Sequence, residues 1–343
     1  MTKLLEVRER ISKFCGEYEV YLKFVYKFVI ALALFSLINE TVGFMESINT
    51  FSIALLLALI CCLFPQGVTI FVASVLVVLH LYALSIEVAL TALLIFALVF
   101  FLYFRFSPKD GVLFALTPIC FVLRIPYVLP IGTGLLRKTY SAAAVACGTV
   151  VFFFLDGIYQ NVTALQATKV GGEVEAAKMS ITIGHLLANK EMYLTVGVFV
   201  ISAIVVYLVR KMSIDHAWKV AIVSGALVQI SGLFVGYLLL DITGKTANMI
   251  IGNLIAIILG LIIEFIFMDL DYSRTERVQF EDDDYYYFVK AIPKKMVASA
   301  DKEVIQFGST SSRDKTKDRN KKNEKPVSRK QMVKELDIDE DFL

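Results

Sequence analysis

The sequence predicts an all-α membrane protein whose chain crosses a bilayer about eight times. The 343 residues are 57% hydrophobic and 19% charged, with a mean hydropathy of +0.69, whereas soluble domains are about 45–50% apolar and about 25% charged. The charges are also segregated, because residues 28–268 carry few of them and both ends of the chain carry many. A hydrophobic body with polar ends is typical of a chain that spans a membrane repeatedly.

Eight apolar runs have the composition of membrane-spanning helices. A spanning helix needs about 20 mostly apolar residues, since lipid offers no hydrogen-bond partner to exposed backbone groups. We expect these spans within a transmembrane domain over 24–268, preceded by a cytosolic N-terminal segment over 1–23. Their apolar cores are Phe24–Leu37, Phe51–Phe64, Val68–Leu84, Val88–Tyr103, Ser141–Tyr159, Met192–Val209, Trp218–Leu240 and Met249–Met268.

The stretch 111–136 is apolar but does not have the pattern of a simple helix. It contains Pro118, Pro126 and Pro130, and Arg124 lies at its centre. Two structures fit this pattern. The stretch forms either one kinked span with a charge at mid-membrane, or a re-entrant hairpin of two half-helices that meet near Arg124.

The positions of lysine and arginine favour the re-entrant hairpin. Short cytoplasmic loops carry an excess of these residues. With eight spans and one hairpin, 29 of the 34 lie on the side of the N-terminus and 4 lie on the other side. A complete crossing by 111–136 would move Arg137, Lys138 and the basic tail to the poorly charged side. We therefore expect a multi-pass protein of the plasma (cell) membrane with both termini in the cytoplasm.

Two segments outside the spans have patterns of their own. The outer loop 160–191 contains apolar residues near helical spacing over Glu173–Asn189, which predicts an amphipathic helix on the outer membrane surface. After the last span, the region 269–307 is expected to hold a small cytosolic β-hairpin. Its strands are predicted at Glu276–Phe280 and Tyr285–Ile292, packed against the membrane body or another subunit.

The last segment, 308–343, is expected to be a tail without a packed core. Residues Gly308–Lys330 have almost no apolar side chains to bury, which predicts disorder. Residues Met332–Leu343 mix acidic and apolar side chains, which is typical of a short motif that binds a cytosolic protein.

Arg124 is the strongest of seven candidate pathway residues. A charge at membrane depth is costly and commonly serves a transport pathway or a buried ion pair. The structural alternative is that Arg124 extends to the interface or pairs within the protein. The full set is Arg124, Pro118, Pro126, Pro130, Gln229, Asp156 and Glu264.

The other polar members of this set have simpler structural explanations. Asp156 lies near the outer end of its span, where an acid is usually a solvated cap. Gln229 shares a helical stripe with three glycines, which favours helix packing. Glu264 lies one turn from the inner end of the last span, where extension to the interface or pairing with a basic loop is the simpler interpretation. We expect the Arg124 guanidinium to lie in water or to be paired, and Glu264 or an anionic ligand or lipid headgroup are equal alternatives for the partner.

The sequence contains no motif that predicts catalysis. The five cysteines and three histidines lack metal-ligand spacing, and no glycine-rich phosphate loop with a lysine occurs. We therefore expect no enzyme activity, cofactor, metal or nucleic-acid partner.

Two function classes remain. The first is a transporter, channel or flippase-like carrier with a polar pathway near the broken helix, acting on an anionic small molecule or lipid. The second is a membrane scaffold or subunit that recruits a cytosolic partner through its C-terminal tail.

The charge count predicts which residues a reagent outside the cell reaches. A cysteine placed at position 2 or near position 300 should resist an impermeant maleimide applied to intact cells, because both termini are expected inside. A matched cysteine in the outer loop 160–191 should react and serves as the positive control. Labelling of either terminal position from outside would overturn this topology.

Overall fold

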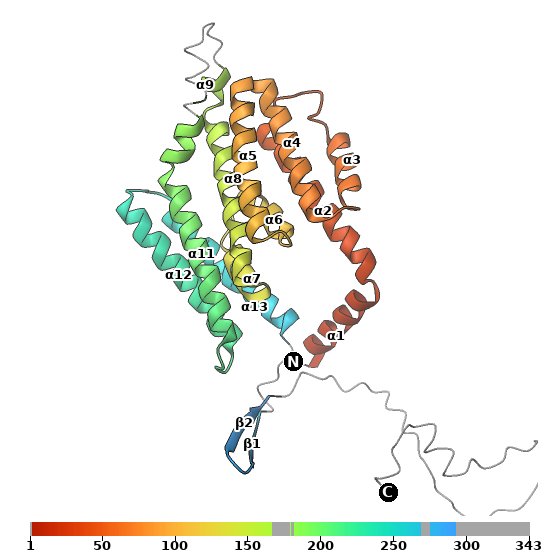
Figure 1. Ribbon diagram of the computed structural model, residues 1–343, viewed down its shortest axis with the longest axis vertical. Helices are drawn as coiled ribbons and strands as arrows, with labels where there is room; N and C mark the ends of the chain where they lie inside the picture. The colour runs from red at the N-terminus through yellow and green to blue at the C-terminus, as the bar shows by residue number, and fades with distance from the viewer. Residues whose placement is uncertain (1, 167–178, 180–181, 269–274, 293–343) are drawn as a thin grey trace, which may run out of the picture. The chain divides into compact units, whose positions relative to one another are not determined.

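The computed structural model describes residues 2–166, 179, 182–268 and 275–292 (Figure 1). Contacts divide the chain into the units Met1–Val297 and Ala298–Leu343. The second unit lies outside the described residues, and so do the predictions made for Gly308–Lys330 and Met332–Leu343.

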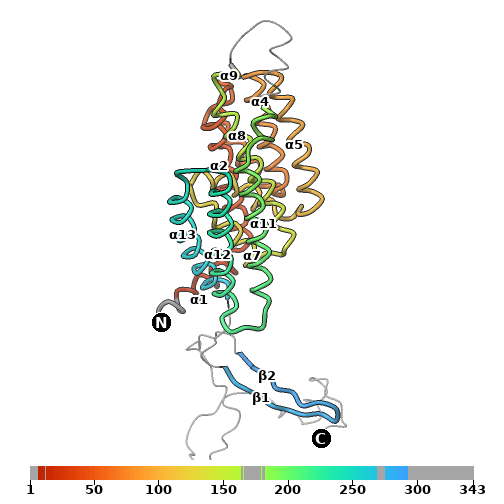
Figure 2. Tube along the Cα trace, turned by 90° about the vertical axis from the view of Figure 1, so that its left-hand side faces the viewer, coloured from red at the N-terminus to blue at the C-terminus, as the bar shows by residue number. Residues whose placement is uncertain are grey.

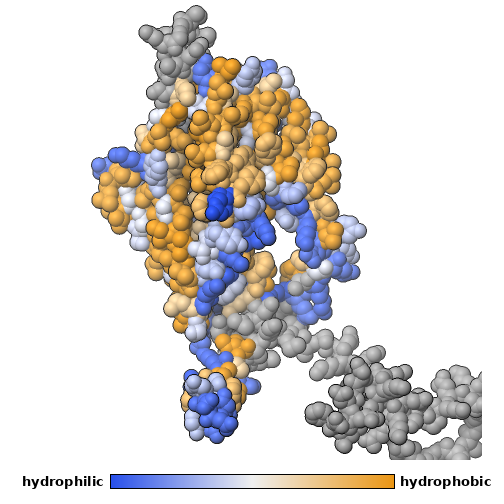
Figure 3. Space-filling view, viewed as in Figure 1, coloured by the Kyte–Doolittle hydropathy of each residue, from blue (hydrophilic) through white to orange (hydrophobic). Residues whose placement is uncertain are grey.

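Seven helices in the described part of the chain are long and apolar enough to cross a membrane. Their outward side chains are hydrophobic, as Figure 3 shows for the face in view; Leu94 and Phe101 are 59% and 73% exposed, and Leu239 is 78% exposed. Soluble monomers rarely expose an apolar surface of this extent, which is typical of membrane interaction. The chain is therefore an all-α, multi-pass membrane protein. The seven helices are α2 (Glu19–Val42), α4 (Gln66–Leu84), α5 (Ile86–Phe106), α8 (Ala142–Gln160), α11 (Lys190–Lys211), α12 (Ala217–Leu239) and α13 (Thr246–Phe267).

The remaining expected span, Phe51–Phe64, forms the shorter helix α3 (Phe51–Cys61). Its 11 residues rise about 16 Å, roughly half the hydrocarbon thickness of a bilayer. Helices α2 and α4 end side by side, where His80 Nε2 lies 3.2 Å from Asn39 Oδ1, so they run in the same direction. The segment between them therefore returns the chain toward the end at which α2 begins. An eighth crossing of the membrane stays a prediction.

We distinguish a basal end and a distal end of the helical part of the protein, each defined by an ion pair that lies there. The basal end contains Asp110 and Arg137, which form an ion pair with 3.6 Å between Oδ1 and Nε. The distal end contains Glu191 and Lys245, another ion pair, at 2.6 Å. At the basal end, Arg8 of α1 (Thr2–Glu17) donates from Nε to the carbonyl oxygen of Ile266 near the end of α13, at 3.2 Å. The chain therefore enters and leaves the helical part at the same end.

The stretch 111–136 forms a helical hairpin. Helix α6 (Gly111–Val122) and helix α7 (Val128–Leu136) are joined by the five-residue tip 123–127. The Asp110–Arg137 pair brackets the hairpin, so both of its ends lie at the basal end. Arg210 of α11 also caps the end of α7 by donating to the carbonyl oxygens of Leu135 and Arg137. A re-entrant position in a bilayer stays a prediction, since it depends on where the membrane lies.

The two arms of the hairpin belong to different groups of helices. Helix α6 packs mainly against α8 and α2, whereas α7 packs mainly against α11 and α13. The first helix group therefore consists of α2, α3, α4, α5, α6 and α8, which share one large apolar cluster. The second helix group consists of α7, α11, α12 and α13, which lie side by side in Figure 2 and share two smaller clusters.

Glycines allow close packing within each group. A Cβ on Gly148 of α8 would lie 2.6 Å from Thr117 Cβ of α6, so α8 packs closely against the first arm of the hairpin. A Cβ on Gly134 of α7 would lie 2.5 Å from Val206 Cβ of α11 and 2.8 Å from the Ala203 carbonyl oxygen. On α12, Gly232 faces Val198 of α11.

A β-hairpin follows the last helix, as predicted. Strand β1 (Glu276–Glu281) pairs antiparallel with β2 (Tyr286–Ala291), and both strands are exposed on both faces. In the turn, the Tyr287 hydroxyl and two backbone N–H groups donate to the Asp282 carboxylate and lower its pKa. Lys290 pairs with Asp215 between α11 and α12, at 2.5 Å, and this hydrogen bond lowers the pKa of Asp215. The cytosolic location of this β-hairpin stays a prediction.

The packing of Gly134 predicts a stability difference between two glycines. Gly134→Ala should destabilise the detergent-solubilised protein by about 1–3 kcal/mol, because a new Cβ overpacks the contact with α11. Gly197→Ala on α11 is the matched control, since no atom lies within 4 Å of the Cβ that it adds. Melting temperatures measured by differential scanning fluorimetry should fall for the first variant and stay level or rise for the second. An equal melting temperature for Gly134→Ala and the wild type would contradict this packing.

Candidate functional site: a charged cavity at the tip of the hairpin

A cavity of about 350 Å³ lies where the hairpin tip meets α8, α11, α12 and α13. Its walls come from both helix groups. The Glu191–Lys245 pair lines it from the starts of α11 and α13, and Arg124, Pro126 and Tyr127 line it from the hairpin tip. Six polar side chains line it: Arg124, Asp156, Glu191, Thr195, Lys245 and Asn248. A volume of this size is within the usual range of small-molecule sites.

Arg124 occupies the turn between the two arms of the hairpin. The turn closes because the N–H groups of Arg124 and Ile125 donate to the carbonyl oxygens of Phe121 and Cys120, at 3.0 and 2.9 Å. This geometry places Arg124 in the left-handed region, with φ of 61°, which costs a non-glycine residue about 1–2 kcal/mol. Pro126 disfavours helical backbone at the residue before it, so α6 cannot continue into α7. Arg124 is exposed and lines the cavity from the break between the two helices.

The Arg124 guanidinium forms no hydrogen bond or ion pair with any residue that the structure describes. The other cation of the cavity differs in this respect. Lys245 Nζ lies 2.8 and 2.6 Å from the two carboxylate oxygens of Glu191, so these two charges neutralise each other. Asp156 accepts a hydrogen bond from the Gln160 amide at 2.7 Å, and it has no ion-pair partner among the described residues.

Aromatic rings form much of the remaining wall. The rings of Phe121 and Phe152 stack with centroids 4.3 Å apart. The ring centroid of Phe199 lies 6.1 Å from that of Phe121 and 6.0 Å from that of Tyr127, and the Tyr127 contact is edge to face. Tyr237 completes the wall from α12. The cavity therefore combines charged groups with flat apolar surfaces.

A buried polar layer lies between the cavity and the basal end. Ser202, Gln229 and Asn253 are fully buried, one on each of α11, α12 and α13. Each lies between a residue of the apolar cluster near the cavity and a residue of the cluster nearer the basal end. Gln229 Nε2 donates to Ser202 Oγ at 3.0 Å, but Gln229 Oε1 and Asn253 Oδ1 have no hydrogen-bond partner among the described residues. Buried oxygens without partners are uncommon and destabilising, so this layer has spare acceptors.

The structure brings together three of the seven candidate residues at the cavity: Arg124, Pro126 and Asp156. The simpler interpretation of Asp156 as a solvated cap did not include its position in the wall of this cavity. Gln229 lies in the polar layer, where its own contacts are structural, and a Cβ on neighbouring Gly225 would meet Val206 of α11.

The other three candidates lie away from the cavity. Pro118 lines a small apolar pocket inside the first helix group. Pro130 is buried in the first turn of α7, where a helix tolerates a missing N–H. Glu264 is buried and follows Gly252, the α13 residue beside the Arg124 carbonyl oxygen, by 12 residues, a rise of about 18 Å. Glu264 is therefore not the partner of Arg124 in this structure.

Several cavity residues carried no signal in the sequence. Glu191 and Lys245 are boundary charges at the starts of two helices, and Tyr127 and Tyr237 have the pattern of ordinary core or interface aromatics. Only the fold brings these four residues together.

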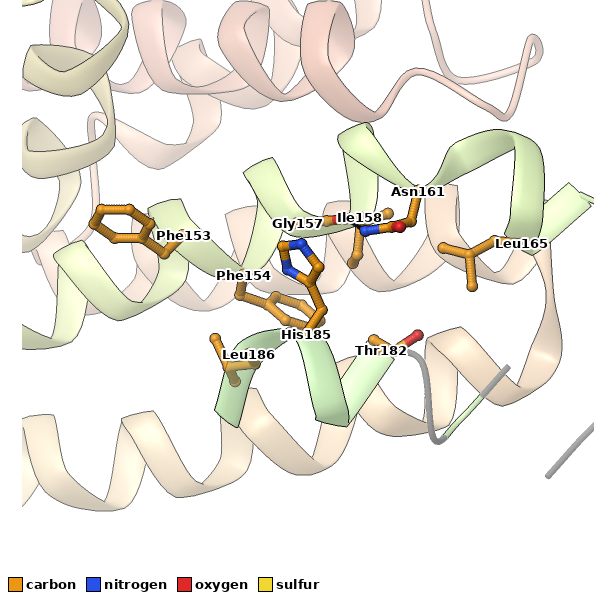
Figure 4. Close-up of a pocket in the computed structure, with 9 residues that line it drawn as sticks. All are labelled: Phe153, Phe154, Gly157, Ile158, Asn161, Leu165, Thr182, His185 and Leu186. Carbon is orange, nitrogen blue, oxygen red and sulfur yellow. Dashed lines mark hydrogen bonds between the residues drawn. The ribbon is translucent and has the colours of Figure 1, made fainter. Parts of the chain in front are cut away.

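A second pocket lies at the distal end of α8 (Figure 4). Residues 182–188 are helical and pack onto α8, with His185 Nδ1 only 2.7 Å from where a Cβ on Gly157 would lie. Its interior of about 10 Å³ holds little more than one water molecule. This segment is part of the predicted outer-loop helix Glu173–Asn189, most of whose first half lies outside the described residues. The contact with α8 is a packing interface.

No protein-family model, no curated protein and no solved structure matches the chain.

Proposed function

We propose that this protein is a membrane carrier whose substrate site is the charged cavity at the tip of the α6–α7 hairpin. The observation that carries the proposal is the unpaired Arg124 guanidinium, which lines a cavity of about 350 Å³ between two helix groups. Charges and broken helices at membrane depth are costly and typically mark a transport pathway. The role of a scaffold does not require an open cavity beside such a charge.

The division into two helix groups supports a carrier mechanism. The cavity lies on the boundary between the groups, and the tip of the hairpin is the covalent link between them there. Carriers work by rocking one packed body against another around a central site. The left-handed turn at Arg124 is a natural hinge for such a motion, because a few residues absorb the change in backbone angles.

The path to the basal end is closed in this structure. Beyond the polar layer, the apolar cluster of Ile131, Val206, Ile222 and Ala226 fills the second helix group, and each is at most 1% exposed. Arg210 reinforces this closure by capping α7. In the proposed carrier, this arrangement is a state that is closed toward the basal end.

The charge distribution orients the proposed carrier. The loops at the basal end carry Arg105, Lys109, Arg137, Lys138 and Arg210, and such loops face the cytoplasm. We therefore place the basal end inside the cell, the cavity mouth outside, and the α6–α7 pair in the membrane as a re-entrant hairpin entered from the cytoplasmic side. A role as a scaffold would depend on the tail motif Met332–Leu343, which lies outside the described residues.

Cysteine accessibility tests this proposal. In a cysteine-free variant in liposomes, Ala226→Cys should react slowly with an impermeant maleimide applied to the basal side, because the closed cluster opens when the carrier changes state. Thr195→Cys, which lines the cavity, should react from the distal side. Prior labelling of one site should suppress the opening that exposes the other.

Three outcomes decide among the function classes. Alternating reactivity supports a carrier. Simultaneous reactivity of Thr195→Cys and Ala226→Cys in one molecule would indicate a channel and overturn the carrier mechanism. Complete protection of Ala226→Cys, under conditions in which Thr195→Cys reacts fully, would overturn transport through this cavity altogether.

A further inference from the structure

The charges of the cavity have a specific arrangement that selects among ligands. Four charged side chains line it, two cationic and two anionic. Lys245 and Glu191 are paired through both carboxylate oxygens, at 2.8 and 2.6 Å. What remains is one cation, Arg124, and one anion, Asp156. These two side chains line the same cavity without forming an ion pair, so their charged atoms are more than 4 Å apart across it.

A ligand that complements this arrangement needs two opposite charges of its own. A simple anion would satisfy Arg124 but leave Asp156 facing a second negative charge in the same cavity. A simple cation would satisfy Asp156 but face the positive charge of Arg124. Like charges repel each other and opposite charges attract, so each simple ion matches only one of the two side chains. A neutral molecule without charges would satisfy neither side chain.

We propose that the cavity binds a zwitterion, with its anionic group at Arg124 and its cationic group at Asp156. This inference rests on the proposed function and names the substrate class. The guanidinium offers a planar fork of donors to a phosphate or carboxylate group. At the other end of the ligand, the Asp156 carboxylate and the aromatic wall both attract a cation, particularly an ammonium group.

The two helix ends at the hairpin tip leave the charge preference to the side chains. The first turn of α7 presents backbone N–H groups, which favour an anion, but α6 presents its last carbonyl oxygens at the same tip. These opposite dipole ends largely cancel. The side chain of Arg124 therefore determines where the anionic group lies.

The aromatic rings accommodate the body of the ligand. Phe121, Phe152 and Phe199 form a continuous apolar face beside the two free charges. This face suits a ligand with methylene or methyl groups near its charges. The shared chemistry is a phosphate or carboxylate joined by a short apolar link to an ammonium group, and it occurs both in free solutes and in zwitterionic lipid headgroups.

Binding of three matched probes tests the charge requirement. Phosphocholine carries both charges, choline only the cation and inorganic phosphate only the anion. Thermal shift titrations of the full protein in a maltoside detergent should show that phosphocholine binds at least about tenfold more tightly than either half. Native mass spectrometry of nanodisc-extracted protein tests the lipid source, since a retained phosphatidylcholine in preference to phosphatidylglycerol identifies a lipid headgroup as the occupant.

Two variants assign the charges, and two matched controls exclude general effects. Arg124→Gln and Asp156→Asn should each weaken binding of the preferred zwitterion, in solution or in lipid, by at least about tenfold. Arg105→Gln and Asp241→Asn alter exposed charges outside the cavity and should leave binding unchanged. Asparagine is tolerated at position 241, where φ is 54°, because it adopts the left-handed region readily.

The outcomes separate this inference from the carrier proposal. Equal binding of phosphate and phosphocholine, with no effect of Asp156→Asn, would overturn the zwitterion and leave a carrier of anions. Absence of binding by every probe and lipid would overturn the zwitterion as well, whereas the cysteine accessibility of Thr195 and Ala226 would still report on transport. Loss of zwitterion binding in both cavity variants, with both controls intact, supports the assignment.

Discussion

The fold depends on the requirement to accommodate one positive charge and one broken helix inside an apolar protein. Hydrocarbon offers no partner for the Arg124 guanidinium or for the backbone groups that a helix break exposes. The protein meets this requirement by leaving Arg124 exposed at the hairpin tip, beside a cavity whose walls come from both helix groups. Three further charged residues, Asp156, Glu191 and Lys245, line the cavity at the hairpin tip, while the outward faces of the long helices are apolar.

The α6–α7 hairpin has polar contacts that fix its base, whereas its tip borders the cavity. At the basal end, the Asp110–Arg137 pair and the cap from Arg210 fix both arms. Glycines at 134 and 148 let each arm pack closely onto its own helix group. At the tip, the turn has a strained residue and faces a cavity. In the proposed carrier, arms that belong to different groups and are joined by a short turn would convert a relative motion of the groups into a change at the cavity.

Much of this architecture follows from the sequence, but the composition of the site does not. The apolar runs predict the long helices, and the prolines around Arg124 predict a broken hairpin, because both signals are local. The β-hairpin at 276–291 was predicted for the same reason. Helix α3 came out shorter than its apolar run, since Cys62 and Leu63 leave the helix before Pro65. Glu264, one of the alternative partners of Arg124, lies too far along α13 to reach it, and sequence alone does not give the depth of each residue along neighbouring helices. Asp156, Glu191 and Lys245 meet only through contacts between distant segments.

The central claim is that the two helix groups move relative to each other about the hairpin tip. The most direct measurement is a distance distribution from pulsed electron paramagnetic resonance. Spin labels at Tyr82 on α4 and Leu239 on α12 lie on exposed sites near the distal ends of the first and second groups. The account predicts two populated distances in nanodiscs, whose proportions shift in Arg124→Gln. A single narrow distance that is identical in the wild type and in Arg124→Gln would contradict it.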